Sequence, residues 1–453
     1  MSCSCNEYTR AAALRRSVAE AGRGLPVVEP GMPVPAGSGL DRRGFLASTL
    51  GFALSVYGAS KLPLGLFEEG IARAQSATPG PVLVSVFLDG GADSLSMLFP
   101  AGHPQYTTFR PQLALAPDDG QPFSEDPSLR WHPSLAPFAE LHAEGKVSVL
   151  PGIGYTDADQ SHFTSRHYYE VGATDAHLRT GWLGRYLDIA GTVDNPIQGL
   201  ALSDALHPSL ASANVPIAAV SRVGDYDFWA SGVWGEVETR MLEALGTFPA
   251  GSDPEAGKVA GVIGQVAQLR TQLLPFEGGS WGTPVPYPTS QNPFPSRLAG
   301  LAAMIAAGLP LRCVTVNAPG MYDTHADQAG ELTSSLALTA ESLRSFQRDL
   351  EARGIADRVL VLVWSEFGRR VEQNGSAGTD HGAAGIGFLI GSRVRGQMLG
   401  EFPGLASLDE DGNLRSTFDY RSLYCSILEQ WFAADAAGII PAAGSFARAT
   451  LLR

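Results

Sequence analysis

The chain has 453 residues, of which 44% are hydrophobic, and this is the composition of a globular protein long enough to bury a sizeable core. Its formal net charge is −14 at pH 7 and its isoelectric point is near 5.1. A surface this acidic repels a phosphate backbone, so we expect no nucleic-acid partner.

The first 74 residues have the features of a removable leader. Arg42 and Arg43 precede a small-residue apolar stretch over residues 47–66, and an Ala-Arg-Ala triplet of cleavage-site form ends at Ala74. Glycine, serine, lysine and proline interrupt the stretch, which disfavours a membrane-spanning helix. We therefore predict a twin-arginine signal within residues 1–74, recognition by the twin-arginine export machinery, and a periplasmic or extracellular location.

Runs with strand character and runs with helical character alternate along the rest of the chain. The predicted strands cover residues 82–88, 146–150, 312–317, 359–364 and 387–390. The predicted helices cover residues 296–309, 331–353 and 420–432, and two more begin near Ser161 and Gly181. This alternation predicts one α/β domain over residues 75–453, with a mostly parallel central sheet and helices on both faces.

Three of the apolar runs end in clusters of carboxylates and histidines. The first leads to Asp89, the second to Asp323 and His325, and the third to Glu366, with Asp380 and His381 close behind. Ligands of open α/β sheets bind beyond the carboxyl ends of the strands, so the clusters should converge. Carboxylate oxygens and imidazole nitrogens bind divalent metals, and two metals can polarise a phosphate or sulfate ester. The sequence therefore predicts a hydrolase that holds one or two divalent metal ions.

Each cluster also has a purely structural interpretation. Asp89 before glycine is typical of a turn or a helix cap. Glu366, if it is buried, must be paired, protonated or metal-bound, and Arg369 or Arg370 could pair it. Asp380 could be part of an ordinary polar turn, or it could hold the second nitrogen of a metal-bound histidine.

The helix expected near Ser161 supplies the candidate nucleophile. A helix N-terminus stabilises an alkoxide and a transferred anion, which favours Ser161. The other hydroxyl candidates are Thr164, Ser165 and Ser94. His162 and His167 are five residues apart and point to different faces of this helix, so at most one of them faces a site there.

Six short motifs, in this order behind the leader, resemble those of the bacterial domain-of-unknown-function 1501 family. They are Phe-Leu-Asp-Gly-Gly-Ala-Asp at 87–93, Ser-His-Phe at 161–163, Gly-Trp-Leu-Gly-Arg at 181–185, Asp-Thr-His at 323–325, Ser-Glu-Phe-Gly-Arg at 365–369 and Gly-Thr-Asp-His-Gly at 378–382. The resemblance covers essentially the whole chain after the leader. Because that family looks distantly similar to the alkaline phosphatase and sulfatase superfamily, it implies an alkaline-phosphatase-like fold.

The resemblance also implies roles for the clustered residues. Asp89 and Glu366 match positions of one metal site, whereas Asp323, His325 and His381 match the other. The superfamily usually has a histidine where this chain has a phenylalanine at 367, so one nitrogen ligand is missing.

The function implied is hydrolysis of a phosphate or sulfate ester of a small molecule or a glycan. Ser161 or a water would attack, while Arg369 or Arg166 would neutralise the developing oxyanion. The alternative is a noncatalytic secreted protein that keeps the fold to bind a glycan or a protein partner, and the missing histidine favours it. The sequence does not specify the oligomeric state.

Overall fold

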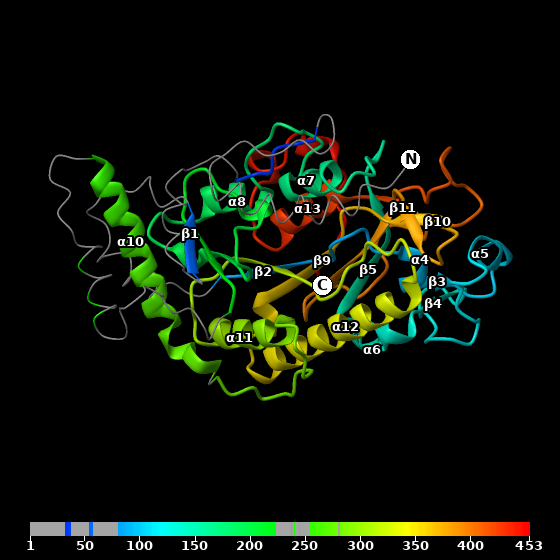
Figure 1. Cartoon of the computed structure of the whole chain (residues 1–453), viewed down its shortest axis with the longest axis horizontal. Helices are drawn as coiled ribbons and strands as arrows, with labels where there is room; N and C mark the ends of the chain where they lie inside the picture. The colour runs from blue at the N-terminus through cyan, green and yellow to red at the C-terminus, as the bar shows by residue number, and fades with distance from the viewer. Residues whose placement is uncertain are drawn as a thin grey trace. The chain divides into compact units, whose positions relative to one another are not determined.

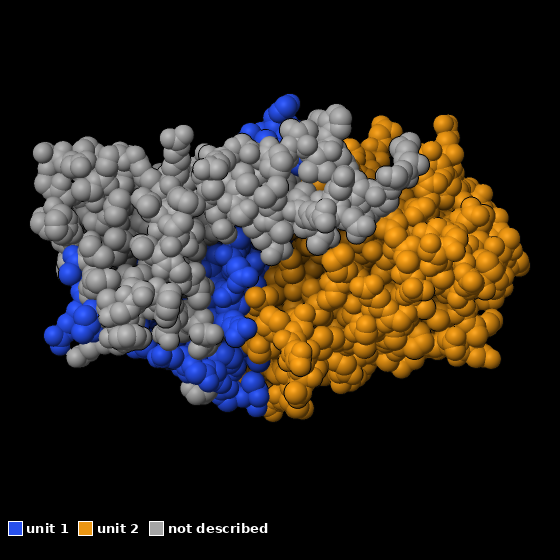
Figure 2. Space-filling view, viewed as in Figure 1, with its two compact units in different colours: residues 1–82, 175–283, 299–315 blue, residues 83–174, 284–298, 316–453 orange. Residues whose placement is uncertain are grey.

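The computed structural model describes residues 32–37, 54–57, 80–222, 237, 240, 244, 254–279 and 281–453. The chain divides into two compact units, coloured separately in Figure 2. Unit 1 comprises Met1–Val82, Asp175–Thr283 and Ala299–Thr315, and unit 2 comprises Leu83–Thr174, Pro284–Leu298 and Val316–Arg453. The paired arginines of the predicted signal lie outside the described residues, and the predicted boundary at residue 74 stays a prediction.

Unit 1 contains short strands, and the sequence pattern predicts only the last of them, at residues 312–317. Their order is β1-β7-β6-β8, with β1 at Leu54–Tyr57, β6 at Gly199–Ala201, β7 at Ile217–Val220 and β8 at Cys313–Asn317. β6 pairs in parallel with β7 and β8, whereas β1 pairs antiparallel with β7. β6 and β7 have three and four residues, which is too short to show a periodic pattern. The helices α8 (Trp182–Ala190) and α10 (Pro254–Leu273) also belong to this unit.

Unit 2 contains the long apolar strands. Their order is β2-β9-β12-β5-β13, with β2 at Val82–Phe87, β9 at Val359–Trp364, β12 at Gly385–Ile390, β5 at Val147–Gly154 and β13 at Phe418–Asp419. Every residue of the first four is buried, as expected for strands covered on both faces. Figure 1 shows α6 (Ala136–Ala143) and α12 (Gln328–Ala352) on one side of these strands, and α7 (Thr164–Val171) and α13 (Tyr420–Gln430) on the other. The predicted α/β class, a mostly parallel sheet between helices, is confirmed.

Seven further α-helices and strands lie in the described part of the chain. They are α4 (Ser94–Met97), β3 (Leu98–Pro100), α5 (Pro104–Phe109), β4 (Leu129–Trp131), α11 (Phe294–Ala306), β10 (Arg369–Gln373) and β11 (Thr379–His381). No helix among the described residues combines the length and the apolar character needed to cross a bilayer.

β12 departs from the parallel arrangement and thereby shapes the site. It pairs antiparallel with both β9 and β5, with Phe388 opposite Val363 and Val149. The reason is the connection, because a parallel neighbour needs a crossover of a dozen or more residues, usually a helix. Here the chain leaves β9, forms the β10–β11 hairpin and returns directly. The segment 365–384 therefore stays at the edge where β9 ends.

Backbone hydrogen bonds hold the turns at this edge together. Leu88 N donates to Trp364 O at 2.8 Å, which joins the ends of β2 and β9. Tyr322 N donates to Asp89 O at 2.9 Å, which joins the turn after β2 to the segment that follows β8. The three segments that carry the predicted carboxylates and histidines are therefore neighbours.

Candidate metal centre

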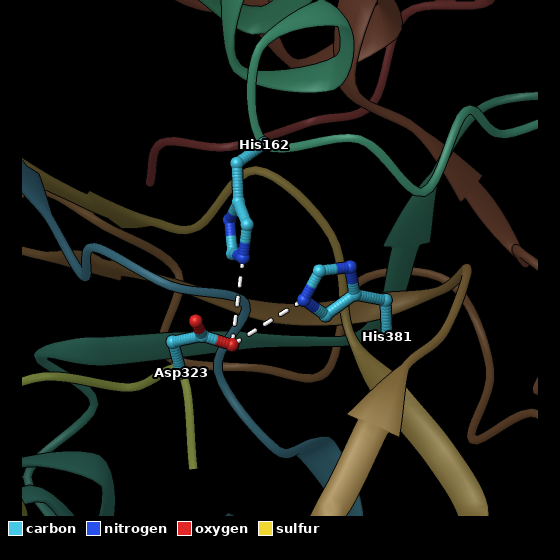
Figure 3. Close-up of side chains that lie close together, drawn as sticks. All are labelled: His162, Asp323 and His381. Atoms are coloured by element: carbon cyan, nitrogen blue, oxygen red, sulfur yellow. Dashed lines mark hydrogen bonds and ion pairs between the residues drawn. The ribbon is translucent and has the colours of Figure 1, made fainter. Parts of the chain in front are cut away.

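Three imidazoles of unit 2 converge on one carboxylate oxygen, Asp323 Oδ1. The Nε2 atoms of His325, His381 and His162 lie 3.0, 3.3 and 3.4 Å from it. The Nε2 atoms of His325 and His381 are 3.1 Å apart. Figure 3 shows His162 and His381 approaching Asp323 from different segments. Tetrahedral ligands at about 2.0–2.1 Å from a zinc ion would be about 3.3 Å from one another, so these spacings suit a metal-binding set.

The other ring nitrogen of each histidine faces an oxygen acceptor. The acceptors of the Nδ1 hydrogen are Glu366 Oε1 for His162 (2.8 Å), Asp380 Oδ1 for His325 (2.9 Å) and the carbonyl oxygen of Gln160 for His381 (2.8 Å). A carboxylate or carbonyl oxygen only accepts, so Nδ1 carries the hydrogen and Nε2 of each neutral ring presents its lone pair to the centre. Metal-binding histidines are typically fixed in this way.

The charges of the centre favour a cation among these side chains. Burial opposes protonation of His162, but its hydrogen bonds to Asp323 and Glu366 raise its pKa to about 9. Burial lowers the pKa of His381. Burial also opposes ionisation of Asp323, yet hydrogen bonds from the three imidazoles hold its pKa far below the usual range. A proton and a metal ion would therefore compete for Nε2 of His162.

Glu366 reaches the centre through His162. Its side chain is fully buried, Oε1 also accepts from Gly90 N (3.0 Å), and Oε2 accepts from Gly91 N (3.1 Å) and Ser365 Oγ (3.0 Å). Burial opposes its ionisation, but the hydrogen bond and charge of His162 lower its pKa. These partners give Glu366 the role of orienting His162, and its predicted role as a direct ligand stays a prediction.

Asp89 is not among the described side chains that converge on Asp323. Its Oδ2 lies 3.5 Å from Nη1 of Arg166, whose Nε donates to Glu170 at 2.8 Å. Phe367, in place of the expected histidine, packs against His162 and His381 with ring centroids 4.8 and 4.9 Å away. Within the described part of unit 2, the geometry therefore provides ligands for one metal ion.

Arg369 is buried and ties the turns of the site together. Its guanidinium donates to the carbonyl oxygens of Gly91 (2.8 Å), Thr379 (2.9 Å), Tyr322 (3.1 Å) and Gly90, and to Asp323 Oδ1. These acceptors come from the turn after β2, the segment after β8 and the start of β11. The observed contacts are structural, and the predicted contact with an oxyanion stays a prediction.

Asp380 lies beside the centre rather than in it. Its side chain is 54% exposed, and its Oδ1 accepts from His325 Nδ1 and from Asn374 Nδ2 at 3.1 Å. Burial opposes its ionisation, but the hydrogen bonds from Asn374 and His325 together lower its pKa. Asn374 Nδ2 also donates to His325 O at 2.9 Å, so one amide fixes both members of the Asp380–His325 pair.

The candidate nucleophiles differ in their surroundings. Ser161 lies just before α7, and its Oγ accepts from Phe163 N and Thr164 N at 3.1 and 3.5 Å, which fixes the turn that carries His162. Ser165 Oγ donates to Glu366 O at 2.6 Å, and buried Ser94 donates to Ala384 O. Ser161 directly precedes His162 in the chain and lies two residues before Phe163, the N-cap residue of α7. Its role as the nucleophile stays a prediction.

Comparison with known proteins supports the family resemblance for part of the chain. The model of the family described as "Protein of unknown function (DUF1501)" matches residues 289–430, which include Asp323, His325, Glu366, Asp380 and His381. This confirms the resemblance over that segment, and His162 lies outside it. No curated protein matches the chain.

Several solved structures are distantly similar to the chain. The C-terminal periplasmic domain of EcEptC from Escherichia coli, in complex with Zn, covers 81% of this chain and 88% of its own at 9% identity, with a TM-score of 0.37. A protein in the alkaline phosphatase superfamily from Vibrio parahaemolyticus covers 93% and 74% at 8% identity, with a TM-score of 0.33. The PsFucS1 sulfatase from Pseudoalteromonas sp. covers 81% and 72% at 12% identity, with a TM-score of 0.32. Such low scores do not indicate an activity for this chain.

Proposed function

We propose that the chain is an exported, metal-dependent hydrolase of phosphate or sulfate esters. His162, Asp323 and His381 would hold one divalent ion, because a carboxylate oxygen and ring nitrogens of these residues lie within 4.8 Å of one another. The observation that carries the proposal is the orientation of the imidazoles, whose Nδ1 hydrogens are held by oxygen acceptors while Nε2 faces Asp323. Two nitrogens and one carboxylate oxygen suit zinc or a similar ion, with a fourth position left open.

His325 and Asp380 are proposed to transfer the proton. The His325 side chain is 23% exposed, compared with 4% for His162 and Asp323, so it lies on the accessible side of the centre. Asp380 holds the Nδ1 hydrogen, so Nε2, which lies 3.0 Å from Asp323 Oδ1 and 3.4 Å from Arg369 Nη1, is the ring nitrogen that would accept a proton from the attacking group. A divalent ion at the centre supplies polarisation of the ester and lowers the pKa of an attacking hydroxyl.

Ser161 or a water is proposed as the attacking group. The backbone amides at the start of α7 already donate to Ser161 Oγ, and such amides stabilise negative charge. Arg166, whose side chain is 21% exposed, is a more accessible cation for the ester anion than the enclosed Arg369.

The second candidate is the noncatalytic binding protein, and one distance favours it. The 3.1 Å between Nε2 of His325 and Nε2 of His381 would also let His325 bind the ion. Four protein ligands make a closed site, which is typical of structural metals, whereas catalytic sites keep a position open. The two candidates therefore differ in what His325 does.

The test combines metal content with turnover of 4-nitrophenyl phosphate and 4-nitrophenyl sulfate. We expect His381→Ala to lose metal and turnover, and His325→Ala and Ser161→Ala to lose turnover while keeping metal. His177→Ala, which changes an exposed histidine outside the centre, is the matched control and should change neither. A metal-loaded wild type that cleaves neither ester, together with loss of metal in His325→Ala, would establish the closed, noncatalytic site instead.

A further inference from the structure

Unit 2 contains a small cavity, lined by both polar and apolar residues, that adjoins the proposed proton-transfer pair. Its volume is about 180 Å³, and its walls include Phe109, residues 370–374, Asp380, Leu408 and the turn at 411–412. Asp380 belongs to both sites, because its Oδ1 accepts from His325 while the residue lines the cavity. A ligand that fills the cavity therefore lies beside the residue whose carboxylate orients His325.

The walls of the cavity are held by internal hydrogen bonds. The Gln373 side chain pairs with the Gln112 side chain at 2.9 Å and accepts from Gln112 N at 2.8 Å. In the turn that carries Asp411 and Gly412, Asp409 Oδ1 accepts from Asp411 N (3.0 Å) and Asn413 N (2.7 Å), which closes the turn. A cavity built in this way needs little ordering when a ligand binds, and such preorganisation favours affinity.

The lining offers both donors and acceptors to a ligand. Arg370 uses Nη1 to donate to the carbonyl oxygen of Asp411 at 3.2 Å, and its other N–H groups have no partner among the described residues. Glu372 is exposed and has no hydrogen-bond or ion-pair partner in the described part of the chain. Asp380 accepts its described hydrogen bonds through Oδ1 alone, which leaves Oδ2 for a ligand.

Charge argues against an anion in this cavity. Three carboxylates (Glu372, Asp380 and Asp411) line it together with one guanidinium, that of Arg370. The anionic ester group should therefore bind at the metal centre, and the cavity should receive an uncharged part of the same substrate.

We propose that this cavity binds one sugar unit of a glycan ester whose ester group lies at the metal centre. Each hydroxyl of a sugar both donates and accepts, which matches carboxylates beside a guanidinium. Phe109 and Leu408, which are partly buried, supply apolar surface for the ring carbons. The cavity is smaller than the roughly 300–1,000 Å³ of sites for drug-sized ligands, so it suits one ring. The assignment of a glycan ester as the substrate rests on the proposed hydrolase function. The binding of a sugar in the cavity does not depend on that function.

The experiment measures binding by ligand-observed NMR on the full mature protein, with glucose, galactose and N-acetylglucosamine as probes. Wild-type protein should bind at least one of them with a millimolar dissociation constant. Arg370→Ala should weaken binding about tenfold or more, because it removes the charged hydrogen-bond donor of the cavity. Glu372→Gln should weaken it less, and Glu331→Gln, an exposed carboxylate on α12, should leave it unchanged.

Inorganic phosphate and ethanolamine separate the other ligand chemistries. The proposal is overturned if no sugar binds, or if Arg370→Ala leaves sugar binding unchanged. It is also overturned if either of these probes binds His381→Ala protein, whose metal centre is disabled, more tightly than every sugar does. Repeating the titration on His381→Ala separates this proposal from the proposed function. If the variant has lost metal and turnover but still binds sugar, the sugar site is supported even if the proposed hydrolase activity is wrong. If the wild type cleaves an ester but binds no sugar, only the sugar site is refuted.

Discussion

Replacing Arg369 by methionine should destabilise the protein rather than only slow a reaction. The side chain is buried and donates to four carbonyl oxygens and to the Asp323 carboxylate, which is itself 4% exposed. Breaking a buried ion pair from one side costs about 3–5 kcal/mol. At roughly 2–4 °C per kcal/mol for a unit of this size, the thermal unfolding midpoint should fall by about 10 °C.

The neighbouring residue provides the control. Arg370→Met removes the same charge from the same strand, but Arg370 is only half-buried and donates one hydrogen bond, to Asp411 O. We expect a change of about 1 kcal/mol or less for this variant. The assay is thermal unfolding followed by circular dichroism on metal-free protein, so that loss of metal does not contribute. Equal midpoints for the two variants, with turnover lost only in Arg369→Met, would refute the structural role and support the predicted contact with the oxyanion.

Three further substitutions test other parts of the account. Asp380→Asn should lower kcat by about 100-fold or more without lowering metal content, because the amide no longer stabilises a protonated His325; kinetics and metal analysis of one preparation check this. Asp93 is fully buried, and although burial opposes its ionisation, its guanidinium partner lowers its pKa. The ionised Asp93 therefore stabilises the fold above the unfolded pKa of about 3.9, and this contribution is lost as the pH falls below that value. Asp93→Asn should lower the thermal unfolding midpoint at pH 7. It should also make the midpoint depend less on pH when unfolding is measured from pH 3 to 7. Replacing Arg42 and Arg43 by lysine should keep the protein in the cytoplasm, as cell fractionation would show, and full export of this variant would contradict the signal assignment.

Strand positions followed closely from apolar runs because these strands are covered on both faces. Residues 359–364 were predicted and observed as β9, and the helix predicted over 331–353 is observed as α12 at Gln328–Ala352. The β10–β11 hairpin was missed because β10 carries two arginines, a glutamate and a glutamine around one valine. Because that hairpin returns the chain directly, β12 runs antiparallel to β9 and β5. The sheet therefore departs from the parallel arrangement at this strand.

Only the site residues that lie at strand ends could be predicted from the sequence. The convergence of Asp323, His325 and His381 follows from their places at strand ends, and the distances agree with it. His162 was missed as a member of the centre, because helical spacing shows only that it and His167 face different ways; its place within the Ser-His-Phe motif was the available signal. The partner of Glu366 could not be read from the chain either, since His162 is 204 residues away in sequence.

The metal content of the purified wild-type protein tests the central claim most directly. The protein, expressed with zinc in the medium, should carry about one equivalent of divalent metal per chain by plasma mass spectrometry, and His162→Ala should lose most of it. His162 is informative because its place in the centre rests on the structure, through its 3.4 Å distance to Asp323 Oδ1. Wild-type protein without metal, or His162→Ala protein with the full wild-type content, would contradict the account.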